Sequence, residues 1–110
     1  MTSSLRRGDV VPLRGPKRAT GHEQKGQRYA VVVQSDDAEW LSTVLVAPTS
    51  TSALPTVFRP EIAIRGRKTL VLIDQLTTAD RSRLGRTVGR LTFDQQTNIE
   101  EALKDILGLL

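Results

Sequence analysis

The chain has 110 residues, a formal net charge of +4 and no cysteine. This length allows one modest hydrophobic core but not two, and the lack of cysteine excludes a disulfide framework, a thiolate zinc site and a cysteine nucleophile. No segment offers the ~18 apolar residues of a membrane span, and residues 1–11 lack the apolar core of a signal peptide. We therefore expect one cytoplasmic domain over residues 1–110, with no membrane partner and with residues 1–6 as a flexible tail.

The charge is unevenly distributed along the chain. Residues 1–28 hold seven basic side chains and two acidic ones, whereas the remaining chain holds nine basic and ten acidic ones. A positive region of this kind attracts polyanions such as nucleic acids and speeds their encounter. The alternative is a solvated basic surface that only keeps the protein soluble, and charge alone does not decide between the two.

Three strands and one long loop are predicted in the first half of the chain. Residues 9–13 are a short apolar run typical of an opening strand. Residues 14–28 are rich in glycine and basic residues and show no periodicity, so they predict a loop, and loops of this length are usually functional or disordered. Residues 29–33 and 41–47 are β-branched apolar runs typical of strands. Pro48 is expected to end the second run, because proline cannot donate to a central strand ladder.

A hairpin is predicted in the middle of the chain. Residues 57–64 contain Pro60 and alternate poorly, so we expect an edge strand with a break. Gly66 supplies the turn of the hairpin. Residues 69–76 form the most continuous apolar run of the chain and predict the strand that follows.

The C-terminal part predicts a helical turn, a short strand and one helix. Asp80 can cap a single helical turn that ends at Gly85, and residues 87–91 form a further short strand. Thr92 followed by Gln95 is a capping-box signature at the start of a helix. Apolar residues then recur at three- and four-residue spacing and define one face, namely Ile99, Ala102, Leu103, Ile106, Leu107 and Leu110.

These elements together predict an α+β fold. Only two Phe, one Tyr and one Trp are present, so the core is expected to be aliphatic, which suits a tight barrel better than a roomy cofactor pocket. Five to seven short, mostly antiparallel strands closed by a C-terminal helix fit such a barrel.

Arg28 and a cluster of hydroxyl side chains suit phosphodiester cleavage without a metal ion. RNA supplies its own nucleophile, the 2′-hydroxyl, so the protein needs a cation for the developing charge, a proton acceptor and a donor for the leaving oxygen. Arg28 suits the cation role because its guanidinium matches phosphate oxygens. Thr49, Ser50 and Thr51 suit the donor role. Taken alone this pairing is unspecific, since arginines border many strands.

Other kinds of catalytic centre find little support. His22 is the single histidine, which excludes acid–base catalysis by a histidine pair and leaves a solvated loop residue as the simpler interpretation. Asp36, Asp37 and Glu39 cluster without a second acidic group to complete a metal site, so a turn is the better account. We therefore expect neither a metal nor a cofactor.

Four sequence blocks appear in the order and spacing of one known family. They are Arg7 to Val10; Gly21, Glu23, Gln24, Gly26 and Arg28 leading into residues 30–33; Val46 to Ser50; and Ile73 to Thr78 followed by Arg81, Leu84 and Gly89. Each block is weak by itself, but together they extend from about residue 6 to the final helix. The chain resembles the MazF/PemK (Kid) family of toxin endoribonucleases from type II toxin–antitoxin systems.

The resemblance implies a fold, an activity and partners. The family folds as a small SH3-like barrel with helices, forms homodimers and cleaves single-stranded RNA without metal. Cleavage occurs at short sequence motifs, with mRNA the expected target, and leaves a 2′,3′-cyclic phosphate and a 5′-hydroxyl. The expected partners are single-stranded RNA, a second copy of the chain and a cognate antitoxin, whose acidic C-terminal segment would fold across the basic groove as it binds.

The resemblance also assigns roles to residues. The family's catalytic arginine corresponds to Arg28, and its catalytic threonine to Ser50, with Thr49 as the second choice. Asp74 matches an acidic residue that acts in proton transfer in PemK-like members, although Leu72 stands where those members carry an arginine. The expected RNA contacts are Lys17, Arg18, His22, Lys25, Thr51 and Gln75.

Structural roles and other functions remain as alternatives. Asp74 could only anchor a strand end, and Gln75 could only satisfy backbone groups at a dimer seam. A CcdB-like toxin that binds DNA gyrase without catalysis would share the barrel but would not need Arg28 beside Thr49 and Ser50. A plain nucleic-acid-binding barrel would need aromatic side chains for base stacking, and those of this chain are scattered.

Overall fold

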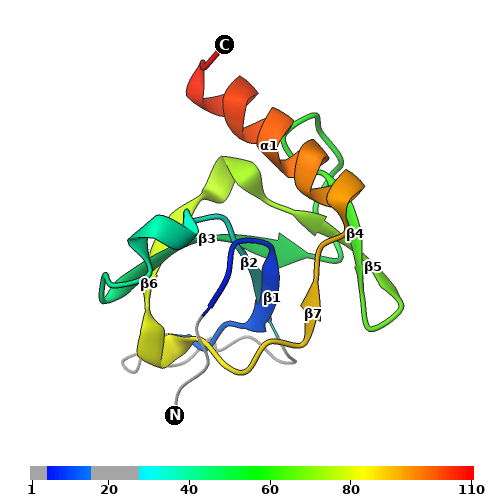
Figure 1. Ribbon diagram of the computed structural model, residues 1–110. Helices are drawn as coiled ribbons and strands as arrows, with labels where there is room; N and C mark the ends of the chain where they lie inside the picture. Colours follow the sequence, from blue (N-terminus) through cyan, green and yellow to red (C-terminus); the bar gives the residue numbers. More distant parts are fainter. Residues whose placement is uncertain (1–4, 16–27) are drawn as a thin grey trace.

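Antiparallel strands wind into a nearly closed barrel, and one helix lies against its side (Figure 1). The computed structural model describes residues 5–15 and 28–110. Within these residues the strands are β1 (Asp9–Pro12), β2 (Tyr29–Val32), β3 (Thr43–Ser50), β4 (Glu61–Ile64), β5 (Arg67–Val71), β6 (Thr77–Asp80) and β7 (Gly89–Arg90), and the helix is α1 (Phe93–Leu107).

The strand order explains how the barrel closes. Neighbouring strands follow the order β4-β5-β3-β2-β1-β7, and β6 pairs with β3. Strand β3 is long enough to pair with β2, with β6 and, at its end, with β5. All pairings between the described strands are antiparallel. The predicted α+β fold, a small SH3-like, mostly antiparallel barrel with a C-terminal helix, is confirmed.

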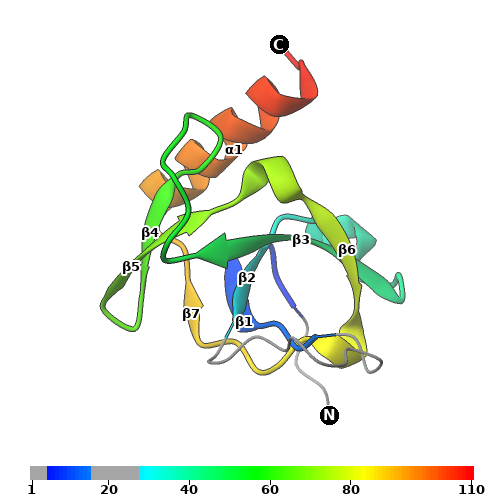
Figure 2. The same cartoon turned by 180° about the vertical axis from the view of Figure 1, so that it is seen from behind.

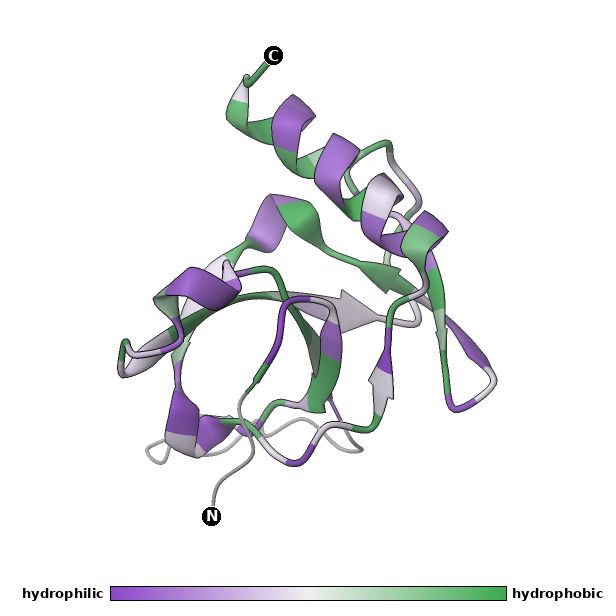
Figure 3. Cartoon of the chain, viewed as in Figure 1, coloured by the Kyte–Doolittle hydropathy of each residue, from purple (hydrophilic) through white to green (hydrophobic). Residues whose placement is uncertain are grey.

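Two aliphatic clusters form the core, one on each face of the barrel wall. Side chains alternate between the faces, so Ala30 and Val32 join the inner cluster, within the ring of β1, β2, β3 and β6, while Val31 and Val33 join the outer cluster under α1. The hydrophobic stretches of the ring stand out in Figure 3. The inner cluster is Val11, Ala30, Val32, Val44, Val46 and Ala79, and the outer cluster includes Val10, Ala47, Ile62, Ile64, Val71, Ile73, Leu91, Ile99 and Ala102.

Pro48 lies inside β3, so the expectation that it would end this strand is wrong. It pairs with Ala30 of β2, and on the opposite edge of β3 the partner changes from β6, which pairs as far as Val46, to β5, which pairs from Thr49. Proline is tolerated at such a change of partner, because its missing N–H interrupts no continuous ladder there. Thr49 and Ser50, the first two residues of the Ser/Thr cluster, therefore belong to β3.

The apolar run at residues 69–76 is not one strand. Strand β5 begins two residues earlier than expected and ends at Val71, after which the chain turns through the 3₁₀ helix η2 (Ile73–Gln75). Ile73 is buried in the outer cluster, so the apolar run indicates burial rather than an extended backbone. The sequence also does not predict β6, because Thr-Thr-Ala-Asp shows little apolar alternation; its pairing with β3 holds it in place.

The smaller elements agree with the sequence. Arg65 and Gly66 have φ values of 51° and 79°, as a two-residue hairpin turn requires, and β4 is an edge strand that begins only after Pro60. The Asp80 carboxylate caps the 3₁₀ helix η3 (Arg81–Arg83) by accepting from Ser82 N–H at 2.9 Å.

Helix α1 begins and ends with the predicted signals. The Thr92 hydroxyl accepts from Gln95 N–H, and the Gln95 side chain accepts from Thr92 N–H, which completes the capping box. Gly108 ends the helix with a left-handed φ of 70°, a conformation that glycine adopts without strain.

Only the first part of the predicted apolar face of α1 is buried. Ile99 and Ala102 are buried and Leu103 is partly buried, whereas the later positions Ile106, Leu107 and Leu110 are exposed. Figure 3 shows hydrophobic residues at this C-terminal end. Within the described residues, no helix is both long and apolar enough to cross a membrane.

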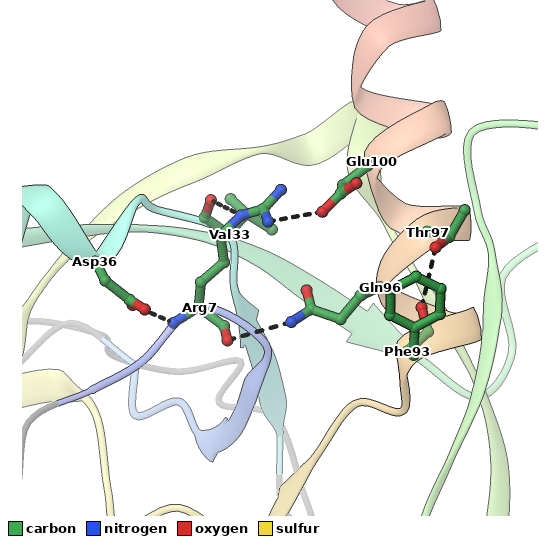
Figure 4. A network of polar contacts seen from close by, with 7 residues as sticks. All are labelled: Arg7, Val33, Asp36, Phe93, Gln96, Thr97 and Glu100. Atoms are coloured by element: carbon green, nitrogen blue, oxygen red, sulfur yellow. Dashed lines mark hydrogen bonds and ion pairs between the residues drawn. The ribbon is translucent and has the colours of Figure 1, made fainter.

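The N-terminal turn fastens α1 to the barrel (Figure 4). The Arg7 guanidinium donates to the Val33 carbonyl at 3.4 Å and to Glu100 of α1 at 2.7 Å. The Arg7 carbonyl accepts from the Gln96 side chain at 3.4 Å, and its N–H donates to Asp36 at 2.8 Å. One arginine therefore joins the end of β2, the 3₁₀ helix η1 (Asp36–Ala38) and α1.

The start of the described chain is also held against the barrel. Leu5 packs against the inner cluster, and Arg6 N–H donates to the buried Asp9 carboxylate at 3.0 Å. Asp9 forms an ion pair with Arg90 at 3.2 Å, which joins β1 to β7. Residues 1–4 of the expected flexible tail lie outside the described residues.

Gly8→Ala is expected to destabilise this turn. Gly8 has a φ of +92°, and an added Cβ would lie 2.5 Å from the Gln96 amide nitrogen. The strained backbone should lower the free energy of unfolding by about 1–3 kcal/mol, measured by urea denaturation. Gly15→Ala is the matched control, since a Cβ there meets nothing within 4 Å. Equal effects of the two substitutions would contradict this account.

Candidate active site

Arg28 lies immediately before β2, and its side chain is exposed. Its carbonyl accepts from Leu13 N–H at 2.9 Å, which continues the β1–β2 pairing by one residue and fixes the Arg28 backbone. On the other side of β2, Ala30 pairs with Pro48, and counting two residues outward places Arg28 opposite Ser50. Cross-strand neighbours share one face of a sheet, so the guanidinium and the Ser50 hydroxyl arise from the same face of adjacent strand ends.

Thr49 has a structural partner for its hydroxyl. Its side chain is 7% exposed, and Oγ1 donates to the Tyr29 carbonyl at 2.9 Å. A hydroxyl has a single proton to donate, and this bond uses it to hold the ends of β2 and β3 together. Thr49 therefore positions Arg28 through the neighbouring residue and offers no donor to a bound molecule.

Ser50 presents its hydroxyl differently. The residue is half-buried, and its Oγ accepts from Ser52 N–H at 3.1 Å and from Ala53 N–H at 3.0 Å. A hydroxyl accepts through two lone pairs and donates one proton, so both acceptor positions are used and the proton is directed away from the loop. Thr51 follows on an exposed bend.

Asp74 is held by an arginine that the sequence analysis does not single out. Arg59 Nε donates to Asp74 Oδ1 at 3.0 Å, and its terminal nitrogen donates to Oδ2 at 2.9 Å. This two-pronged contact is the strong geometry of an arginine with a carboxylate. Gln75, the next residue, is exposed.

The pairing of β4 with β5 brings Arg59 to this place. Strand β4 begins after Pro60, but Val71 N–H donates to the Pro60 carbonyl at 2.8 Å and Ile73 N–H to the Phe58 carbonyl at 3.1 Å. The register of the hairpin thus continues past the strands and puts Arg59 opposite Leu72. The sequence contains a signal for this pairing, because counting outward from the predicted hairpin turn at Gly66 places Arg59 opposite Leu72.

The ion pair changes the acidity of Asp74. Its hydrogen bonds from Arg59 lower the pKa of the Asp74 carboxyl below the ordinary value, and they raise the pKa of the Arg59 guanidinium. A carboxylate with a lowered pKa is a weaker proton acceptor near neutral pH. The arrangement therefore favours a permanently ionised pair over proton transfer at Asp74.

The contribution of Asp74 to stability should disappear in acid. A group whose pKa is lower in the folded than in the unfolded chain stabilises the fold above its unfolded pKa, and this stabilisation is lost as the pH falls through the folded pKa. We expect Asp74→Asn to lower the melting temperature at pH 7, with a difference from wild type that shrinks below about pH 4. Circular dichroism melts from pH 7 to pH 3 measure it, with Glu101→Gln on α1 as the control. A difference independent of pH would contradict the role of the pair.

Several predicted positions fall outside the described residues, namely Lys17, Arg18, His22 and Lys25. Of the predicted site, Arg28 immediately precedes β2, and Thr49 and Ser50 end β3, the strand that pairs with β2. Asp74 follows β5, which pairs with the end of β3. Among residues 5–15 and 28–110, no three His, Cys, Asp or Glu side chains converge in a group that could hold a metal ion.

Comparison with known sequences identifies relatives over most of the chain. The sequence model of a family described as PemK-like, MazF-like toxins of type II toxin–antitoxin systems matches residues 6–107. The candidate toxin Rv3098A of Mycobacterium tuberculosis (strain ATCC 25618 / H37Rv) is 48% identical over 90 residues, which cover 81% of this chain and 84% of that protein.

Solved structures with the same fold include two complexes. MazE–MazF (form III) from Deinococcus radiodurans superposes with a TM-score of 0.80 at 21% identity, over 98% of this chain and all of that one. An endoribonuclease in complex with its cognate antitoxin, from a mycobacterial species, has a TM-score of 0.78 at 18% identity, over 97% and 98% of the two chains. At these identities the matches establish the fold.

Proposed function

Because this chain belongs to the PemK-like, MazF-like toxins of type II toxin–antitoxin systems, we propose that it is an endoribonuclease that cuts single-stranded RNA without metal or cofactor. The observation that supports the proposal is the register of β2 and β3, in which Ala30 pairs with Pro48, because the same register continued by two residues would bring Arg28 opposite Ser50. A guanidinium beside a donor hydroxyl is the minimum that a self-cleaving phosphodiester requires from its catalyst. The substrate is mRNA in the cytoplasm, cut at a short sequence motif.

Cleavage proceeds by attack of the RNA on itself. The 2′-hydroxyl loses its proton and bonds to the adjacent phosphorus, and the bond from phosphorus to the 5′-oxygen of the next nucleotide breaks. That oxygen takes up a proton, so the products are a 2′,3′-cyclic phosphate and a 5′-hydroxyl. Arg28 pairs with the non-bridging oxygens, where charge develops in the transition state.

Ser50 acts as a hydrogen-bond donor to the reacting phosphate. Its Oγ already accepts from Ser52 N–H and Ala53 N–H, so its remaining capacity is the hydroxyl proton. These two N–H groups also fix the direction in which that proton points. Ser50 rather than Thr49 is therefore the acting hydroxyl, because the proton of Thr49 is bonded to the Tyr29 carbonyl.

Asp74 does not take the proton of the 2′-hydroxyl in this proposal. Arg59 lowers the pKa of Asp74, which makes it a poor base. Thr51 and Gln75 are exposed near the ends of β3 and β5 and contact the RNA chain. The basic residues of the long loop, Lys17, Arg18, His22 and Lys25, contribute further contacts, because cations draw in the phosphate backbone.

Two protein partners complete the proposal. The exposed apolar end of α1, where Leu107 is 55% and Leu109 60% exposed, suits an interface with a second copy of the chain, because such apolar patches mark interfaces. Sedimentation velocity distinguishes the dimer from a monomer. The second partner is a cognate antitoxin with an acidic C-terminal segment; of the similar structures, one is an endoribonuclease in complex with its cognate antitoxin and one is a MazE–MazF complex. Co-expression of the chain with candidate antitoxins, followed by co-purification, tests it.

The decisive experiment is incubation of purified protein with a mixed-sequence RNA in the presence of EDTA. The expected result is cleavage at one short motif, with 5′-hydroxyl ends on the downstream fragments. Sequencing of those ends gives the motif. RNA that stays intact at adequate protein concentration would overturn the ribonuclease proposal and would favour a non-enzymatic toxin.

A further inference from the structure

Arg59 makes three hydrogen bonds that tie a loop to the body of the protein. Two of them go to the Asp74 carboxylate, and the third runs from its other terminal nitrogen to the Leu54 carbonyl at 3.0 Å. The side chains of Arg59 and Asp74 are 19% and 29% exposed, so the pair is accessible to water and its specificity lies in the two-pronged geometry of the contact.

Asp74 provides a fixed anchor for this arginine. It lies in η2 between Ile73, which is 1% exposed in the outer cluster, and Gln75, whose N–H donates to the Leu72 carbonyl at 2.9 Å. Leu72 N–H in turn donates to the Pro48 carbonyl of β3 at 2.8 Å. The carboxylate is therefore attached to the same strand that carries Ser50.

The β3–β4 loop (residues 51–60) has little apolar burial to hold it. Leu54 and Val57 are each 77% exposed, so their side chains contribute little hydrophobic stabilisation. The loop rises from the end of β3 beside α1 in both orientations of the molecule (Figures 1 and 2). Polar contacts therefore contribute much of what holds its conformation, at Ser50 and Arg59 at its two ends and at Thr56 between them.

These contacts form a short physical path from Asp74 to the Ser50 hydroxyl. Arg59 holds the Leu54 carbonyl, and the preceding residue, Ala53, donates its N–H to Ser50 Oγ. Displacement of Leu54 would move Ala53 and release one of the two bonds that orient the hydroxyl. Ser50 is thus oriented by a loop whose far end is locked by the ion pair.

We propose that Arg59, clamped by Asp74, is a positioning residue that fixes the β3–β4 loop and thereby the direction of the Ser50 hydroxyl. This inference rests on the proposed ribonuclease function for its catalytic consequence, but the clamp itself is a property of the loop. It assigns Asp74 to the support of the site, as the anchor of Arg59, and it adds Arg59 to the residues on which cleavage depends.

A double-mutant cycle tests whether Arg59 acts through Ser50. Arg59→Ala should lower kcat by about 10- to 100-fold with a smaller change in KM, because the phosphate contact of Arg28 is retained. In the background of Ser50→Ala the same substitution should have little further effect. Arg59→Lys keeps the charge but not the two-pronged contact and should fall between. Arg67→Ala is the matched control, because it also removes one positive charge but lies at the far end of the same hairpin.

Amide hydrogen exchange tests the clamp independently of cleavage. The N–H groups of Ser52 and Ala53 should exchange faster in Arg59→Ala and in Asp74→Asn, while core amides of β2 stay protected. The proposal is overturned if these two amides keep their wild-type exchange rates. It is also overturned if Arg59→Ala lowers kcat by the same factor in the Ser50→Ala background as in the wild type. A wild-type protein that cuts no RNA would overturn the proposed function instead, and the exchange rates would still decide the clamp.

Discussion

Arg28→Ala should reduce the rate of RNA cleavage by about a thousandfold or more, the range expected when an arginine that neutralises a transferring phosphoryl group is lost. The fold should survive, because the backbone of Arg28 is held in the β1–β2 pairing, which the substitution leaves in place. Its carbonyl bond to Leu13 N–H does not involve the side chain, and the side chain is exposed. Single-turnover cleavage of an RNA containing the motif measures the effect on the chemical step.

Two companion substitutions sharpen this experiment. Arg28→Lys retains the charge but loses the planar fork that matches two phosphate oxygens, so it should recover only part of the lost rate. Arg67→Ala removes one positive charge from the exposed hairpin end and should leave the chemical step unchanged. If Arg28→Ala unfolds the protein in circular dichroism, Arg28 is structural, and if it cuts like wild type, the proposed chemistry is wrong.

The regular parts of this fold follow from local sequence signals. The capping box at Thr92 and Gln95 determines where α1 begins, and Gly66 determines the hairpin turn, because each depends on residues only a few positions apart. The strand over residues 29–33 is likewise identified by its β-branched residues. Such features can be predicted because the residues whose interactions create them lie close together in the sequence.

The errors arise where distant parts of the chain decide the local structure. Pro48 stays within β3 because one edge of the strand changes its partner from β6 to β5 at that point, and no local sequence pattern predicts this change. The sequence Thr77 to Asp80 becomes β6 only because the first half of β3 offers it a partner. Tertiary pairing here overrides weak intrinsic propensity.

In the candidate site, too, some features follow from nearby residues and others from distant parts of the chain. That Arg28 and the Ser/Thr cluster occur at strand ends is readable from the sequence, but which hydroxyl acts depends on register. A shift of one residue exchanges the faces of a strand, and the observed register gives Thr49 to the Tyr29 carbonyl and leaves Ser50 its proton. Arg59 was missed because its partner, Asp74, is fifteen residues away across a hairpin.

The second large effect is expected at Ser50. Ser50→Ala should lower kcat by on the order of a hundredfold, the cost of removing one donor from a developing negative charge. Ser50→Thr keeps the hydroxyl and should retain most of the activity. Thr49→Val, by contrast, deletes the buried bond to the Tyr29 carbonyl, so it should cost about 1–2 kcal/mol of stability with a much smaller effect on the chemical step.

The pair of substitutions separates a donor to the phosphate from a support for the strand. For each variant, the cleavage rate at saturating RNA and the free energy of unfolding from denaturant melts are measured on the same samples. Thr51→Val is the control for the loss of a hydroxyl from the exposed bend. The opposite result would also identify the acting hydroxyl. If Thr49→Val abolishes cleavage without loss of stability while Ser50→Ala cuts normally, then Thr49 supplies the proton, and its bond to Tyr29 must open when RNA binds.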